Sequence, residues 1–136
     1  MEYAVTVWDP YQEFLIDQME MVQKRGARFV LQNYTKTDSI TDMLHQINWD
    51  PLRQRRKNAR LKMCFNIYYK QIPSPELRPV LETPYYFGKC DHEHKIKLKT
   101  AKTTMFHQSF FPRTIREWNS LTTDSVNSKT AAKFDF

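Results

Sequence analysis

Hydrophobic positions recur at helical spacing through the first half of the chain. Four apolar residues follow a seven-residue rhythm that predicts one buried helical face: Leu15, Met19, Val22 and Phe29. Just before them, Asp9 can cap the free N–H groups of a first turn, and Pro10 suits the first helical position. We therefore predict a helix that opens at Asp9-Pro10 and runs to about Gln32.

Two further helices are predicted before residue 73. Ser39 is followed three residues later by Asp42, a variant of the capping box that predicts a short helix containing Met43 and Leu44. Asp50-Pro51 repeats the opening of the first helix and predicts a third one, which must end before Pro73. Three helices are thus expected within residues 1–72.

The second half has a less regular pattern. Residues 73–94 hold four prolines and one glycine without a sustained period, which is typical of an irregular connector. Residues 95–99 alternate strictly between Lys and apolar side chains, and residues 105–111 are rich in aromatics. Both patterns favour short strands, which could pair as a small β-hairpin.

A last helix is predicted from Pro112, because Ile115, Trp118 and Leu121 share one apolar face. The expected fold class is therefore mainly α. Residues 1–72 form a helical segment, and residues 73–136 contain the proline-rich connector, the short strands and the C-terminal helix.

Composition and net charge indicate which partners and which location to expect. The 136 residues include 21 Lys and Arg against 15 Asp and Glu, and the resulting charge of +6 favours polyanions, of which nucleic acid is the commonest. No window approaches 18 apolar residues and the N-terminus does not resemble a signal peptide, so we expect no membrane partner. With only two cysteines, the expected location is intracellular, nuclear or cytoplasmic.

The third predicted helix carries a row of cations. Arg53, Arg56, Lys57 and Arg60 stand at i, i+3, i+4 and i+7, which places them within an arc of about 100°. Cations in the first turns oppose the helix dipole, and no acidic residue lies between positions 53 and 62. A solvated helix face is one interpretation, and binding of a phosphate backbone is the other.

The final predicted helix also carries cations where they oppose the helix dipole. Arg113 and Arg116 fall in its first turn, and Glu117 offsets them only in part. An anion at this helix start would be held by free N–H groups and guanidinium groups together, so we predict a phosphate contact here. Three aromatic residues nearby could stack on bases or, as the apolar period favours, belong to the core: Phe110, Phe111 and Trp118.

No candidate active site emerges. Residues 90–94, Cys-Asp-His-Glu-His, invite a metal-site hypothesis, but structural zinc needs two ligand pairs at defined spacings. Cys64 stands among apolar residues, where burial would make its thiol inert. Two glycines cannot build a glycine-rich phosphate loop, and no Asp-Asp pair suggests two-metal catalysis. We therefore expect no catalytic residue, metal, cofactor or small-molecule substrate.

Several blocks of the sequence together resemble one family. The N-terminal blocks are Tyr3-Ala4, Val7-Trp8-Asp9-Pro10, Val22-Gln23-Lys24-Arg25 and Ala27-Arg28-Phe29-Val30. The C-terminal block covers residues 110–121, and Trp49-Asp50 with the arginine-rich stretch lies between. In order and spacing they resemble the segment just after the polymerase core in reverse transcriptases of LINE-type (non-LTR) retrotransposons, especially jockey-like ones.

The resemblance implies a place within a larger enzyme. Residues 1–72 would be thumb-like, and the following residues would belong to the region that helps hold template RNA and target DNA. In the family, the fingers and palm with the magnesium-binding aspartates lie upstream, so RNA-directed DNA polymerase activity is not expected from this chain alone. The palm and fingers would be further partners. Nucleic-acid contact is implied for six residues: Arg53, Arg56, Lys57, Arg60, Arg113 and Arg116.

Departures from the family pattern suggest a decaying copy of such an element. Gly26 stands where the family usually has Ala, Thr122 stands where Pro is common, and residues 131–136 end short of the usual closing helix. The alternative left open is a stand-alone protein-interaction or nucleic-acid-binding module without any catalytic context.

Overall fold

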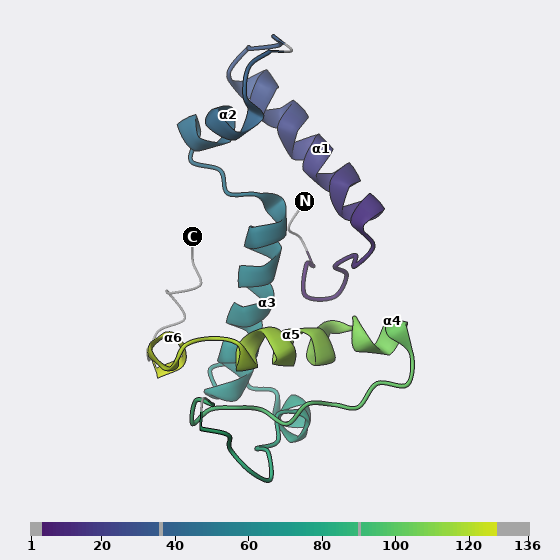
Figure 1. The fold of residues 1–136 in the computed structure, drawn as a ribbon, viewed down its shortest axis with the longest axis vertical. Helices are drawn as coiled ribbons and strands as arrows, with labels where there is room; N and C mark the ends of the chain where they lie inside the picture. Colours follow the sequence, from purple (N-terminus) through teal and green to yellow (C-terminus); the bar gives the residue numbers. More distant parts are fainter. Residues whose placement is uncertain (1–3, 36, 90, 128–136) are drawn as a thin grey trace.

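The computed structural model describes residues 4–35, 37–89 and 91–127. Its elements in chain order are α1 (Glu13–Val30), α2 (Ile40–Gln46), α3 (Leu52–Tyr68), the 3-10 helix η1 (Pro75–Val80), α4 (Thr104–His107), α5 (Phe110–Asn119) and α6 (Thr123–Asn127). The fold is mainly α, as predicted (Figure 1).

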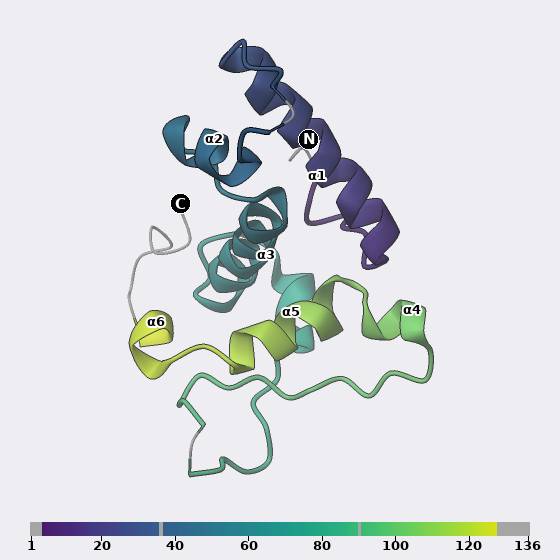
Figure 2. The ribbon, with the colours of Figure 1, turned by 45° about the horizontal axis from the view of Figure 1, so that its top comes forward.

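Helix α3 is the central element. Helices α1 and α2 pack together near its N-terminal end, and α5 crosses its C-terminal half (Figures 1 and 2). The connector that contains η1 loops beneath α5 before the chain returns through α4. Residues from both predicted segments, 1–72 and 73–136, therefore lie against the same central helix.

The hydrophobic core fills the crossing of α3 and α5. Its fully buried members are Leu61, Cys64, Phe65, Ile96, Ile115, Trp118 and Val126. Trp118 is completely buried, so the core interpretation of this residue is confirmed and it offers no platform to a base. The two segments share this core, because α3 supplies three of the seven residues and the later segment supplies four.

Helix α1 differs from its prediction in its start and in its buried face. It begins at Glu13 rather than beside Asp9, and its N-cap, Gln12, makes no side-chain cap. Its buried residues are Ile16, Gln23 and Ala27, whereas the predicted face is partly open, with Val22 49% and Phe29 73% exposed. Gln23 faces α3 because its side-chain amide forms two hydrogen bonds there. It donates to the Asp50 carbonyl just before that helix and accepts from the Leu52 N–H at its start.

The next two helices begin close to their predicted starts. The Ser39 hydroxyl oxygen accepts the N–H of Asp42 at 3.3 Å, as the capping box predicts, and α2 follows. Helix α3 begins directly after Pro51 and ends at Tyr68, before the predicted stop at Pro73.

The predicted β-hairpin is absent from the described ranges. Residues 95–99 form no strand, because Ile96 pairs its backbone with a side chain: its N–H donates to Asn119 Oδ1 at 2.9 Å, and Asn119 Nδ2 donates to the Ile96 carbonyl at 2.7 Å. The aromatic stretch 105–111 instead covers the end of α4, the two-residue turn at Gln108 and Ser109, and the start of α5. Thr103 caps α4 by accepting the N–H of Phe106, so local capping outweighs the strand preference of aromatic residues.

Candidate functional site

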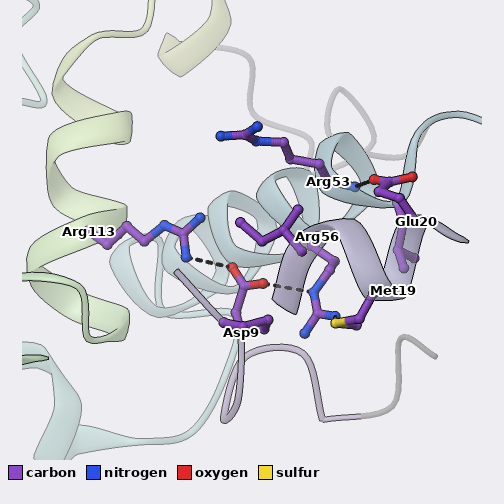
Figure 3. A pocket seen from close by; sticks show the side chains of 9 residues that line it. Asp9, Met19, Glu20, Arg53, Arg56 and Arg113 are labelled. Carbon is purple, nitrogen blue, oxygen red and sulfur yellow. Dashed lines mark hydrogen bonds and ion pairs between the residues drawn. The ribbon is translucent and has the colours of Figure 1, made fainter. Parts of the chain in front are cut away.

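The carboxylate of Asp9 lies between α3 and α5 and binds arginines from both helices (Figure 3). It accepts a hydrogen bond from Arg56 Nε at 2.8 Å, lies 3.0 Å from Arg113 Nη1 and pairs with Arg60 Nη1. Glu117 completes the group, which we call the Asp9 cluster: Asp9, Arg56, Arg60, Arg113 and Glu117. The residue predicted to cap α1 is thus the centre of an ion-pair network.

Glu117 ties the two helices together from the α5 side. Both of its carboxylate oxygens accept from Arg60 Nη2, at 2.7 and 2.9 Å. One of them also lies 3.7 Å from Arg113 Nε, one helical turn earlier. Two carboxylates therefore serve three guanidinium groups.

Most of the cluster is removed from solvent. The side chains of Arg56 and Arg60 are 4% and 3% exposed, and that of Asp9 is 11% exposed. Burial lowers the pKa of Arg60, whereas its hydrogen bond to Glu117 raises it. An arginine nevertheless stays protonated in a protein, so the cluster holds permanent charges that must be neutralised by neighbours.

The turn before Asp9 also covers Arg56. The Arg56 Nη2 group donates to the Trp8 carbonyl at 2.8 Å, and its guanidinium carbon lies 4.8 Å from the centre of the Trp8 ring, a cation–π distance. Arg56 Nη1 contacts Met19 Sδ of α1 at 2.9 Å. One arginine therefore joins α3, α1 and the N-terminal turn.

Two α1 side chains satisfy the start of α3. Gln23 Oε1 accepts the N–H of Leu52 at 2.9 Å, and Glu20 Oε1 accepts the N–H of Arg53 at 2.7 Å (Figure 3). A negative side chain at this position stabilises the helix dipole. Glu20 of the neighbouring helix α1 therefore offsets the unfavourable interaction between the cations of this first turn and the dipole of α3.

The structure divides the six predicted nucleic-acid residues into two groups. Arg56, Arg60 and Arg113 belong to the Asp9 cluster. The α3 cations have no acidic residue among positions 53–62, but Asp9 and Glu117 supply carboxylates from distant parts of the chain. The other three are Arg53, Lys57 and Arg116. The structure does not join all six into one exposed row.

These three outer cations have different surroundings. Arg53 is exposed and pairs with Glu13 at 3.0 Å. Lys57 is half-buried on α3. Arg116 is half-buried and donates to two backbone carbonyls, those of Pro112 and His107, at 3.2 and 2.9 Å. Because carbonyl groups carry no net charge, the charge of Arg116 is not neutralised by these bonds.

Sequence reasoning missed the acidic half of the site. The partners Asp9 and Glu117 lie far along the chain from α3, outside any window of local pairs. One signal does point to burial: Arg56 and Arg60 continue the four-residue row that begins at Leu52 and ends at Cys64, and all four are buried. A cation in an apolar row requires a carboxylate from elsewhere.

The two histidines of residues 90–94, where no metal site was predicted, have separate partners. The ring nitrogen Nε2 of His92 bonds the Trp118 carbonyl at 3.1 Å, and Nδ1 of His94 bonds the Tyr68 hydroxyl at 3.2 Å. Cys90 lies outside the described residues. Within the described ranges, no three His, Cys, Asp or Glu side chains gather in an arrangement that could hold a metal ion.

Cys64 is fully buried in the core. Burial raises the pKa of its thiol to about 12, so at neutral pH almost none of it is the nucleophilic thiolate. The prediction of an unreactive thiol agrees with this environment.

An apolar groove of about 720 Å³ lies beside the Asp9 cluster. It runs between the N-terminal turn, the first half of α1 and the start of the α4–α5 region. Its apolar lining includes Val7, Trp8, Tyr11, Leu15, Val22 and Met105. Several of these side chains are strongly exposed, with Val7 at 84% and Met105 at 75%.

Comparisons with protein-family models, with curated proteins and with solved structures found no match to this chain. Over the described residues, every helix is too short or too polar to cross a lipid bilayer.

Proposed function

We propose that the chain is a nucleic-acid-binding piece of a non-LTR retrotransposon reverse transcriptase, without the polymerase active site. The observation that carries this proposal is the meeting of the three blocks that resemble the family. Asp9 from the first block, Arg56 and Arg60 from the middle one, and Arg113 from the last form one ion-pair cluster. Because residues of the three blocks contact one another in the folded chain, the cluster supports the proposal that the three blocks come from one functional module.

In this proposal the Asp9 cluster is the scaffold and the outer cations contact phosphate. Arg60 pairs with Glu117 and fixes α3 against α5, and Arg56 pairs with Asp9 and fixes α3 against the N-terminal turn. Arg53, Lys57 and Arg116 remain as the accessible or incompletely neutralised cations of the predicted set. The charge of +6 adds long-range attraction to any polyanion.

The test is the salt dependence of binding to a generic RNA and a generic duplex DNA. We expect the change of Arg53, Lys57 and Arg116 together to Gln to make binding to DNA less dependent on salt. The slope of the logarithm of the binding constant against the logarithm of the salt concentration should become less negative by about 2 to 3, since each phosphate contact contributes about 0.9. The matched control changes three exposed lysines elsewhere, Lys70, Lys89 and Lys102, to Gln. Equal slopes for both variants would show diffuse attraction and contradict the assignment.

A second candidate function is protein docking, and the apolar groove favours it. Its side chains Val7, Trp8 and Met105 are exposed in the single chain. Within the first proposal, the palm of the polymerase would cover this surface. A stand-alone interaction module would instead bind a partner with little salt dependence, and the triple Gln variant would bind it unchanged.

A further inference from the structure

Helix α1 carries large apolar side chains on the face that points away from α2 and α3. Phe14 is 63% exposed, Met21 47%, Val22 49% and Phe29 73%. At 3.6 residues per turn these four positions fall within an arc of about 100° and extend along most of the helix. We call them the outer stripe. Exposed apolar side chains that gather on one face mark an interaction site.

The outer stripe lies opposite the side of α1 that packs inside the chain. Ile16, Gln23 and Ala27 are the buried residues of this helix, and α2 and α3 pack against it. Figures 1 and 2 place α1 at the outer edge of the molecule, with α2 and α3 on its inner side. Val22 also borders the apolar groove beside the Asp9 cluster, so the groove and the outer stripe adjoin.

The charges along the outer stripe change sign from the first half of α1 to the second. Asp17 and Lys24 are both exposed and stand seven residues apart, so they lie at the same edge of the stripe. Arg25 is exposed as well and lies in its middle. The midpoint between Asp17 and Lys24 falls about 1.5 Å along the helix from the midpoint between Phe14 and Phe29, since that is the rise of one residue. The stripe therefore matches a copy of itself that runs in the opposite direction.

We propose that the outer stripe binds the same stripe of a second copy of this chain, with the two α1 helices antiparallel. A two-fold axis near Met21 sets Phe14 of each copy against Phe29 of the other, because the two residues lie at nearly equal distances from Met21 along the helix. Both rings then leave water, and burial of apolar surface drives association. None of the six predicted nucleic-acid residues lies on α1, so the inference goes beyond the proposed function and does not depend on it.

Charge favours a second copy as the occupant and the antiparallel direction. In that direction each Asp17 lies beside Lys24 and Arg25 of the other copy, so opposite charges meet at both ends of the contact. In the parallel direction Asp17 would face Asp17, and the cations would face one another. Each copy carries a charge of +6, but exposed charges more than about 8 Å apart are largely screened at physiological salt. The aliphatic stem of Arg25 can cover apolar surface while its guanidinium group reaches Asp17.

Sedimentation equilibrium of the full chain over a range of protein concentrations tests this pairing. We expect a reversible equilibrium between monomer and dimer at physiological salt. Asp17→Lys and the double variant Lys24→Glu/Arg25→Glu each place like charges together at both ends, so each alone should dimerise about tenfold more weakly or worse. An equimolar mixture of these two variants restores opposite charges at both ends and should recover most of the lost affinity.

The matched control is Lys70→Glu/Lys89→Glu, which alters the net charge as much as the α1 double variant does, at exposed residues outside α1. It should dimerise like the original chain. Circular dichroism checks that each variant keeps its helices. If a charge variant unfolds, Phe29→Gln takes its place, because it changes an exposed side chain and should also weaken the dimer.

An original chain that stays monomeric at every concentration overturns the proposal. A dimer that the charge variants and Phe29→Gln leave unchanged also overturns it, because the contact would then lie on another surface. A mixture that dimerises no better than its two components contradicts the pairing of opposite charges. These results are separate from nucleic-acid binding, which the variant of Arg53, Lys57 and Arg116 tests.

Discussion

Asp9 neutralises buried arginines that come from two different helices. Asp9→Asn keeps the size of the side chain but removes its charge, so Arg56 and Arg60 would stay buried with too few anions. Breaking a buried ion pair from one side costs about 3 to 5 kcal/mol. We therefore expect urea denaturation of Asp9→Asn to show a free energy of unfolding lower by about that amount.

Arg53→Gln is the matched control for this residue. Arg53 pairs with Glu13 at a similar distance, but both side chains are more than half exposed. Exposed pairs contribute about 0 to 1 kcal/mol, and the backbone bond from Arg53 to Glu20 survives the change. Equal losses in the two variants would mean that burial does not govern the strength of the Asp9 contacts.

At the scale of elements, Gly26 is a weak point in the middle of α1. A methyl group added there would meet the Trp49 ring at 3.6 Å, which is ordinary van der Waals contact. Glycine in a helix interior costs about 1 kcal/mol relative to alanine. Gly26→Ala should therefore raise the free energy of unfolding by about 0.5 to 1 kcal/mol in thermal or urea denaturation. A lower stability would show that Trp49 cannot accommodate the methyl group.

The elements also show which parts of a fold are readable from a sequence. Ser39 and Pro51 act on residues next to them, and the helices they predict begin where expected. The buried side of α1 depends on what α3 needs, because Gln23 is drawn inward by the start of that helix. Apolar rhythm alone could not reveal this, and it placed Val22 and Phe29 inside when they are exposed.

The cations of the candidate site could be predicted from the sequence, whereas their acidic partners could not. The cations of α3 and α5 stand in short, visible clusters, so their unusual positions can be seen in the sequence. Their partners are distant: Arg56 reaches across 47 positions to Asp9, and Arg60 across 57 to Glu117. Pairing at that range is set by how α3 and α5 cross, which no local pattern encodes.

At the scale of the whole molecule, the shared core predicts one cooperative unit rather than two. Leu61, Cys64 and Phe65 of α3 are at most 2% exposed, and the other fully buried members of their cluster come from residues 96–126. A chain that ends at residue 72 would leave these side chains open to water, at a cost of about 25 cal/mol for each Å² of apolar surface. We expect circular dichroism of this fragment to show no sigmoidal urea transition, unlike the full chain.

A cooperative transition of the fragment at the midpoint of the full chain would contradict this prediction. It would show that residues 1–72 fold by themselves, as the helical pattern of the sequence alone suggests. The comparison separates local helix formation, which the fragment retains in part, from the packing that only the later residues provide.

The contact between Asp9 and Arg113 has a kinetic consequence, because it closes a loop over most of the chain. Asp9 and Arg60 are 51 positions apart, so the closure to Arg113 spans about twice that length and costs about 0.6 kcal/mol more in chain entropy. We expect a contact of such long separation to form late in folding. In that order the N-terminal turn would close over the core that α3 and α5 share, and a pair that forms after the folding barrier slows unfolding of the native state.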